Sequence, residues 1–140
     1  MNGMELDEYA VRSVNALFNQ SDWTEWLMLK ADDCGKITVD DFGITWQHQT
    51  PSQNWDLFVK SLPATECRYA LVTLKEHQKY FFIMWAPSKA KVKDRLSIAM
   101  HMVHVKEHIE KIGGHAHATL QAHELDDLSY ERALTKITLR

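Results

Sequence analysis

Two apolar segments stand only four residues apart near the middle of this 140-residue chain. They read RYALVTL at Arg68–Leu74 and KYFFIMW at Lys79–Trp85, and the polar residues KEHQ separate them. Their shortness and their aromatic and β-branched content favour a pair of antiparallel β-strands over a buried helix. Neither segment alternates apolar with polar residues, which is typical of strands buried on both faces. We therefore predict one α/β domain over residues 1–140, in which helices cover both faces of a central mixed β-sheet.

A long amphipathic helix is expected directly after the second segment. Pro87 interrupts the chain, and an apolar stripe at helical spacing then predicts a helix over Lys89–Ile112. Gly113 and Gly114 would end this helix. The stripe consists of Ile98, Met102, Val105, Ile109 and Ile112.

Positive charge gathers at the start of this predicted helix. The cations are Lys89, Lys91, Lys93 and Arg95. The helix dipole disfavours a cation there by roughly 0.3–1 kcal/mol, so an acidic partner would explain the arrangement. Residues 75–111 carry eight Lys or Arg against four acids, whereas the whole chain has a net charge of −3. A sequence pI of about 6.2 argues against nucleic-acid binding, and the local charge suits steering toward an acidic surface.

The remaining elements have weaker signals. We expect helices over residues 7–18, 55–62 and 129–139 and strands over residues 26–30, 36–39 and 117–122. Gly35 would supply the hairpin turn between the first two strands, and Ser52 and Ser129 would be helix N-caps. Residues 42–53 receive no assignment.

The composition indicates a cytoplasmic protein. No segment approaches the length of a membrane span, and the acidic N-terminus lacks the pattern of a signal peptide. Two cysteines, Cys34 and Cys67, are not spaced as metal ligands or as a disulfide framework, and Cys67 is expected to be a buried thiol. Of the five tryptophans, Trp26 and Trp85 are expected in the core, and the other three receive no role.

Histidines offer an alternative from another functional class. His101, His104 and His108 share one edge of the long predicted helix, and a zinc-dependent enzyme could use such ligands. No HExxH motif accompanies them, however, so the polar flank of a surface helix is the preferred interpretation. Their protonation near pH 6–7 would add positive charge beside the basic helix start.

Several blocks of the sequence resemble the ADF/cofilin (actin-depolymerising factor homology) family. The run KYFFIMWAPSKAKVKDRL at residues 79–96 is similar to the strand, Trp-Pro and long-helix signature of that family. Residues 62–70, 119–122 and 128–137 look like its central strand, closing strand and C-terminal helix. The resemblance implies an actin-binding protein, not an enzyme, that binds monomers, filaments or both and promotes filament depolymerisation and turnover. It implies no cofactor.

The family pattern assigns two actin-binding faces. One comprises the N-terminus and the long-helix start, here Met1, Asn2, Gly3, Met4, Lys91, Lys93, Arg95 and Leu96. The other, used for filaments, lies on the strand hairpin and the C-terminal helix, here Lys75, His77, Lys79 and Lys136. Phosphoinositides are a further candidate partner. We expect a monomer associated with the cytoskeleton.

Three positions depart from the family pattern. Asn2 replaces a serine whose phosphorylation switches binding off, Met100–Met102 replaces a small and polar stretch, and His77 replaces a basic residue. These changes predict weaker monomer binding and altered severing. The coactosin-like branch, which binds filaments without strong depolymerising activity, is the alternative within the superfamily.

Overall fold

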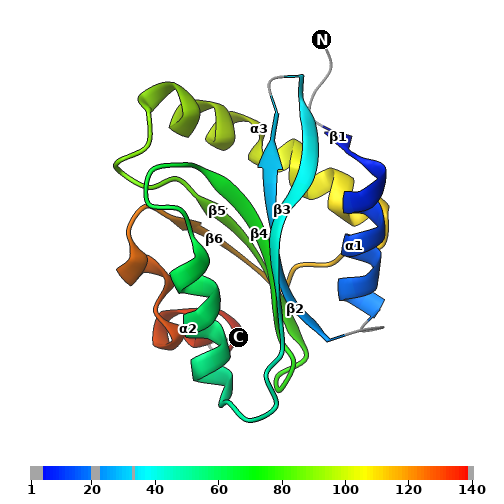
Figure 1. The fold of residues 1–140 in the computed structure, drawn as a ribbon, viewed down its shortest axis with the longest axis vertical. Helices are drawn as coiled ribbons and strands as arrows, with labels where there is room; N and C mark the ends of the chain where they lie inside the picture. Colours follow the sequence, from blue (N-terminus) through cyan, green and yellow to red (C-terminus); the bar gives the residue numbers. More distant parts are fainter. Residues whose placement is uncertain (1–4, 20–22, 33, 139–140) are drawn as a thin grey trace.

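The computed structural model describes residues 5–19, 23–32 and 34–138. Within these residues, six strands form one sheet in the order β1-β3-β2-β4-β5-β6 (Figure 1). The strands are β1 Glu5–Leu6, β2 Thr24–Ala31, β3 Lys36–Ile44, β4 Arg68–Leu74, β5 Lys79–Trp85 and β6 Ala118–Ala122. The pairs β1–β3 and β5–β6 are parallel and the others are antiparallel, so the sheet is mixed as expected.

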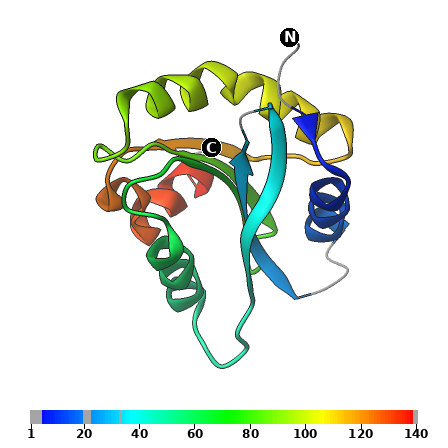
Figure 2. The same ribbon diagram turned by 45° about the horizontal axis from the view of Figure 1, so that its top comes forward.

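Helices cover both faces of this sheet, which confirms the predicted fold class. In the described part of the chain they are α1 Glu8–Asn19, α2 Pro51–Ser61, α3 Val92–Lys111 and α4 Tyr130–Thr138, with a short 3-10 helix at Leu125–Leu128. Helices α1 and α3 lie on one face, and α2 and α4 lie on the other (Figures 1 and 2). No helix among the described residues has the length and apolar character needed to cross a bilayer.

Strands β4 and β5 form the centre of the molecule, as their composition predicts. Every residue of β4 is buried, and the two strands pair antiparallel from Arg68↔Trp85 to Leu74↔Lys79. Side chains such as Val72 point toward α2 and α4, while their neighbours, such as Leu71, point toward α1 and α3. The sheet therefore separates two apolar cores.

Two predicted helix starts are wrong. Helix α3 begins at Val92 with Lys91 as its N-cap, three residues later than expected. Helix α2 begins at Pro51 with Thr50, not Ser52, as its N-cap. The Thr50 hydroxyl accepts the Gln53 N–H at 3.1 Å and the Gln53 side chain accepts the Thr50 N–H at 2.8 Å, which is a capping box. Proline suits the first helical position because it has no N–H to satisfy.

Other local expectations are confirmed. Gly35 and Gly113 adopt positive φ angles of 85° and 101°, at the β2–β3 turn and just after α3. The Ser129 hydroxyl accepts the Arg132 N–H at 3.2 Å at the start of α4. β6 is the edge strand beside β5.

The burial predicted for Trp26 and Trp85 is confirmed, whereas the burial predicted for Cys67 is not. Trp26 and Trp85 are buried as expected, and Trp55 is also a core residue, whose indole N–H donates to the Leu128 carbonyl at 2.7 Å. Cys67 is only half-buried, and this burial raises the pKa of its thiol. The prediction of a buried Cys67 is therefore wrong.

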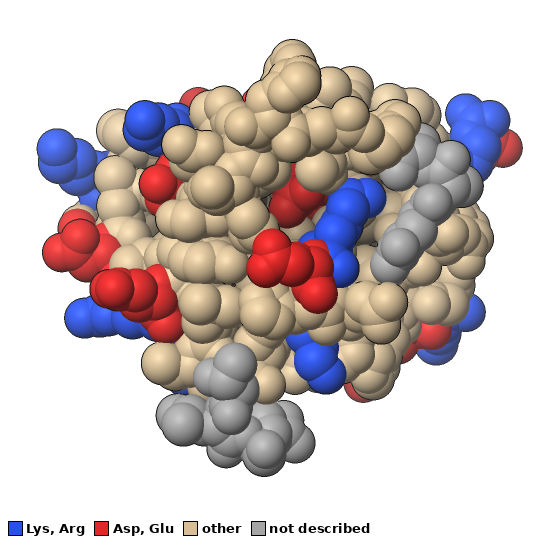
Figure 3. All heavy atoms as spheres, turned by 90° about the horizontal axis from the view of Figure 1, so that it is seen from below, with Lys and Arg blue, Asp and Glu red and all other residues tan. Residues whose placement is uncertain are grey.

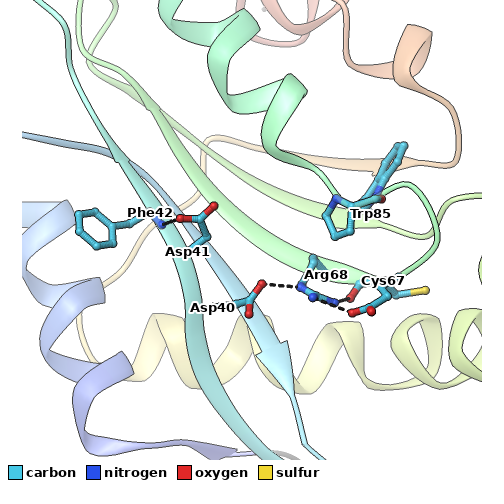
Figure 4. A network of polar contacts seen from close by, with 8 residues as sticks. Asp40, Asp41, Phe42, Cys67, Arg68 and Trp85 are labelled. Atoms are coloured by element: carbon cyan, nitrogen blue, oxygen red, sulfur yellow. Dashed lines mark hydrogen bonds and ion pairs between the residues drawn. The ribbon is translucent and has the colours of Figure 1, made fainter.

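A buried arginine links the loop before β4 to strand β3. The Arg68 guanidinium, with a side chain only 8% exposed, bonds Asp40 at 3.0 Å and Glu66 at 2.8 Å, and it donates to the Cys67 carbonyl (Figure 4). The Trp85 indole N–H donates to the Pro63 carbonyl at 2.7 Å nearby. These contacts fix residues 63–67 against the sheet.

Candidate functional site

The start of α3 is mounted on the closing strand of the sheet. After β5, the Ala86 and Ser88 N–H groups donate to the carbonyls of Ala122 and His123. The Ala90 N–H then donates to the Pro87 carbonyl, which turns the chain into the helix. Because Ala86, Pro87 and Ala90 are buried, the helix start has a fixed position relative to the sheet.

An apolar ridge runs along the outer side of α3. We define this ridge by Val92, Leu96, Met100 and Val103, whose exposed fractions are 60, 64, 69 and 58%. The opposite side of the helix carries Ile98, Val105 and Ile109, which are buried in the core as the stripe predicts. The helix is thus apolar on two sides, and only one of them packs against the described part of the chain. Exposed apolar surface of this extent is typical of an interaction site.

Sequence reasoning found only one member of this ridge. Leu96 was assigned from the family pattern, whereas Val92 and Val103 were overlooked and Met100 was treated as a departure that weakens binding. The spacing i, i+4, i+8, i+11 could have revealed the ridge, because those positions share a helix face. Met102, in contrast, packs against the core, so the Met100–Met102 segment does not face outward as a unit.

Only two of the four cations predicted for the first turns of the helix lie within α3. Lys89 and Lys91 precede the helix, and only Lys93 and Arg95 belong to its first turn. Asp94 lies between these two and suits the positive end of the helix dipole. The conflict with the dipole that the sequence suggested is therefore smaller than expected.

Lys93 and Arg95 differ in their surroundings. Lys93 is exposed, beside an open groove of about 1280 Å³ that lies between α3 and the β2–β3 hairpin. Arg95 is half-buried, and its Nε donates to the Ala90 carbonyl at 3.3 Å. Lys93 is thus accessible from solvent, whereas Arg95 also braces the helix start.

The three histidines of α3 do not converge on one point. The His101 Nδ1 lies 2.9 Å from the Ser97 carbonyl, and the His104 Nδ1 lies 3.8 Å from the Glu107 carboxylate. His108 lies within electrostatic reach of Glu5. Among residues 5–19, 23–32 and 34–138, no three His, Cys, Asp or Glu side chains are placed to hold a metal ion.

The N-terminal part of the predicted monomer site lies outside the described residues. Met1, Asn2, Gly3 and Met4 belong to that part of the chain. The first described residue, Glu5, forms an ion pair with Lys36 at 2.8 Å, and this contact lowers the pKa of the Glu5 carboxyl. The α3 residue within electrostatic reach of Glu5 is His108. At a rise of 1.5 Å per residue, His108 lies about 20 Å from Arg95 along the helix.

The predicted filament-binding residues lie around the β4–β5 turn and on α4. Lys75 and His77 belong to a tight turn, in which the His77 N–H donates to the Leu74 carbonyl at 3.0 Å. Lys79 opens β5, and the exposed Lys136 is in the last turn of α4. Figure 3 views the molecule from this end, where basic and acidic side chains are mixed on a mostly uncharged surface.

The sequence matches a known family along nearly its whole length. Residues 3–138 match the model of the family described as cofilin/tropomyosin-type actin-binding proteins. The chain is 30% identical over 128 residues to the actin depolymerizing factor ADF of Toxoplasma gondii, which covers 91% of this chain and 96% of that relative.

Solved structures show the same fold. Cofilin from Streptomyces griseoflavus superposes with a TM-score of 0.76 at 21% identity and covers 98% of both chains. Coactosin from Entamoeba histolytica gives a TM-score of 0.69 at 20% identity, over 99% of this chain and 97% of that one. At identities of 21 and 20%, the two structures show only that the fold is shared.

Proposed function

This chain belongs to the cofilin/tropomyosin-type actin-binding protein family, and from this membership we propose that it binds actin and promotes filament depolymerisation. It acts in this proposal by binding rather than by catalysis. Its setting is the cytoplasmic cytoskeleton, and it works as a monomer built of one domain over residues 1–140.

The observation that carries the proposal is the apolar ridge of α3. Leu96 and Met100 at its centre stand out from a helix whose other side is anchored in the core. A rigid apolar ridge can enter an apolar cleft of a partner with little loss of conformational freedom. Truncation of a few such central side chains removes most of the affinity in typical interfaces.

Charge beside the ridge supports an acidic partner. Lys91 and Lys93 are exposed next to Leu96, and Arg95 lies in the same turn. Exposed cations of this kind raise the rate of encounter with an acidic surface more than they raise final affinity. They would also suit the phosphate groups of phosphoinositides, which we propose as competitors for this face. Met1–Met4 would complete the face, and Asn2 cannot be phosphorylated as a serine would be.

Depolymerisation requires a second contact. We assign it to Lys75, His77, Lys79 and Lys136, which lie in the β4–β5 turn, at the start of β5 and in the last turn of α4. The turn lies at the opposite end of the ribbon from the start of α3 (Figure 1). A protein that touches two neighbouring subunits can favour one arrangement of them over another. Its differential affinity for that arrangement then shifts the filament toward it.

Leu96→Asp tests the proposal at the ridge. We expect at least about a tenfold loss of affinity for actin monomers, because the substitution would place an unpaired carboxylate in an apolar contact. Thermal unfolding should change little, since the Leu96 side chain is 64% exposed. Leu57→Asp is the matched control, because Leu57 is also an exposed leucine but lies on α2, beyond the sheet.

Two measurements complete the test. Sedimentation with filaments and a polymerisation time course with labelled actin should show that the wild-type protein binds filaments and speeds their disassembly. Decoration without disassembly would support the coactosin-like alternative instead. The proposal fails if the wild-type protein binds neither form of actin, and the ridge assignment fails if Leu96→Asp binds monomers as tightly as the wild type.

A further inference from the structure

A second exposed apolar cluster lies at the opposite end of the molecule from α3. Trp23, Ile44 and Trp46 have exposed fractions of 57, 41 and 51% and surround a hollow of about 600 Å³. We call them the tryptophan patch. The hollow is also lined by Thr24, Thr45, Gln47 and His48. None of these residues belongs to the faces discussed above.

The backbone beneath the tryptophan patch is held in place. The Thr45 N–H donates to the Trp23 carbonyl at 2.7 Å, which joins the start of β2 to the end of β3. Asn54, which is only 6% exposed, accepts the Trp46 N–H at 3.2 Å and donates to the Trp46 carbonyl at 3.3 Å. Both indole rings are therefore presented to solvent from a fixed main chain, which lowers the entropic cost of binding through them.

The tryptophan patch adjoins the surface that carries the predicted filament contacts. The Glu25 side chain bonds the Thr45 hydroxyl and lies within electrostatic reach of Lys75 in the β4–β5 turn. The Tyr130 hydroxyl, at the start of α4, is in turn within reach of Glu25 and Glu76. Glu25 thus lies near the patch, the turn and the start of α4, so these three parts of the chain are neighbours.

Charge alone is a weak basis for binding at this end. Lys75 has Glu76 as its neighbour in the turn, and acidic side chains lie beside basic ones across this surface (Figure 3). Ion pairs between exposed side chains contribute little affinity. Tryptophan, in contrast, is among the residues that most often dominate an interface.

We propose that Trp23, Ile44 and Trp46 contact a second actin subunit of the filament, as the apolar part of the surface that carries Lys75, Lys79 and Lys136. The inference rests on the proposed function, because it takes actin as the partner. The start of β2 and the end of β3, which carry the patch, lie at the opposite end of the ribbon from the start of α3, so two neighbouring subunits can be contacted at once (Figure 1). The patch would give this end the affinity that its mixed charges do not supply.

A double variant, Trp23→Ala with Trp46→Ala, tests the inference. We expect sedimentation to show at least about a tenfold loss of affinity for filaments, with affinity for monomers changed less than about twofold. Tyr9→Ala is the matched control, because Tyr9 is an aromatic residue of similar exposure at the start of α1, and it should leave filament binding unchanged.

The outcomes separate this inference from the proposed function. If the wild-type protein binds no actin, the proposed function fails. If it binds filaments and the double variant binds them equally well, only the inference is overturned. A wild-type dimer in sedimentation velocity that becomes a monomer in the double variant would also overturn it, because a second copy would then cover the patch.

Salt dependence provides a further readout. Lys75→Ala with Lys79→Ala should flatten the decrease of filament affinity with added salt, since it removes exposed charges. The tryptophan double variant should lower affinity at every salt concentration and leave that slope unchanged. A slope that changes with the tryptophan variant would contradict an apolar contact.

Discussion

At the scale of single residues, Arg68 shows how a charge can be placed inside this fold. Its side chain is only 8% exposed, but its carboxylate partners Asp40 and Glu66 are 35 and 56% exposed. The partners would therefore regain water if the arginine were removed. A fully enclosed ion pair would instead leave an unpaired buried charge, which is much more costly.

Arg68→Met should consequently destabilise the protein by only about 1.5–3 kcal/mol, the range for lost hydrogen bonds to charged groups. Methionine keeps much of the apolar stem and removes the guanidinium. Denaturant unfolding monitored by tryptophan fluorescence would measure the change. Arg12→Met, at an exposed position of α1, is the control and should lie within about 0.5 kcal/mol of the wild type. Equal stabilities for both variants would contradict a structural role for Arg68.

At the scale of elements, α3 has both a structural and a binding side. Its buried stripe was predictable, because Ile98, Val105 and Ile109 recur at helical spacing. The ridge on its other side also satisfies helical spacing, but spacing alone does not show that this side stays uncovered. The predicted first residue of the helix was also wrong. Lys89, Ala90 and Lys91 are acceptable in a helix, and they are excluded from α3 only by the turn in which the Ala90 N–H donates to the Pro87 carbonyl.

Strand β6 is attached to β5 partly through a histidine. The backbone N–H of Tyr80 donates to the imidazole Nδ1 of His117 at 3.0 Å. The backbone N–H of His117 donates in return to the Tyr80 carbonyl at 2.8 Å. Burial, then the charge of Lys79, then His115 lower the pKa of His117. The neutral imidazole is thus favoured in the folded protein, where its Nδ1 must remain an acceptor.

Acid should therefore weaken this attachment. The unfolded chain binds the proton more readily, so the stability contributed by His117 is lost as pH falls below about 6.5. His117→Asn offers an acceptor that does not titrate, so its stability should fall less than that of the wild type between about pH 7 and pH 5.5. His104→Asn, at an exposed position of α3, is the control for the loss of a histidine outside this contact. Parallel stability curves for wild type and His117→Asn would count against the role of this bond.

At the scale of the whole molecule, the sheet joins two cores into one unit. Trp55 and Phe58 of α2 fill one core, and Tyr69 and Phe82 of the central strands contribute to the other. Because β4 is buried on both faces, neither core can open without exposing the strand that supports the other. We therefore expect the two cores to unfold together.

Phe58→Ala and Phe82→Ala test this coupling from opposite sides of the sheet. Both side chains are fully buried, so each variant should lose about 3–5 kcal/mol of stability. Each should still unfold in a single transition, with tryptophan fluorescence and circular dichroism giving the same midpoint. Two separate midpoints in either variant would show that the cores are independent.

The sequence by itself determined the central strands, the helices that cover them and the family of the chain. These features depend on periodicity, turn residues and a contiguous motif, all of which are local in the chain. It also indicated the basic helix start at Lys93 and Arg95. Only the tertiary structure decided which apolar residues remain outside, because burial depends on what the rest of the chain covers. Val92 and Trp46 are as apolar as their buried neighbours, and no other part of the described chain packs over them.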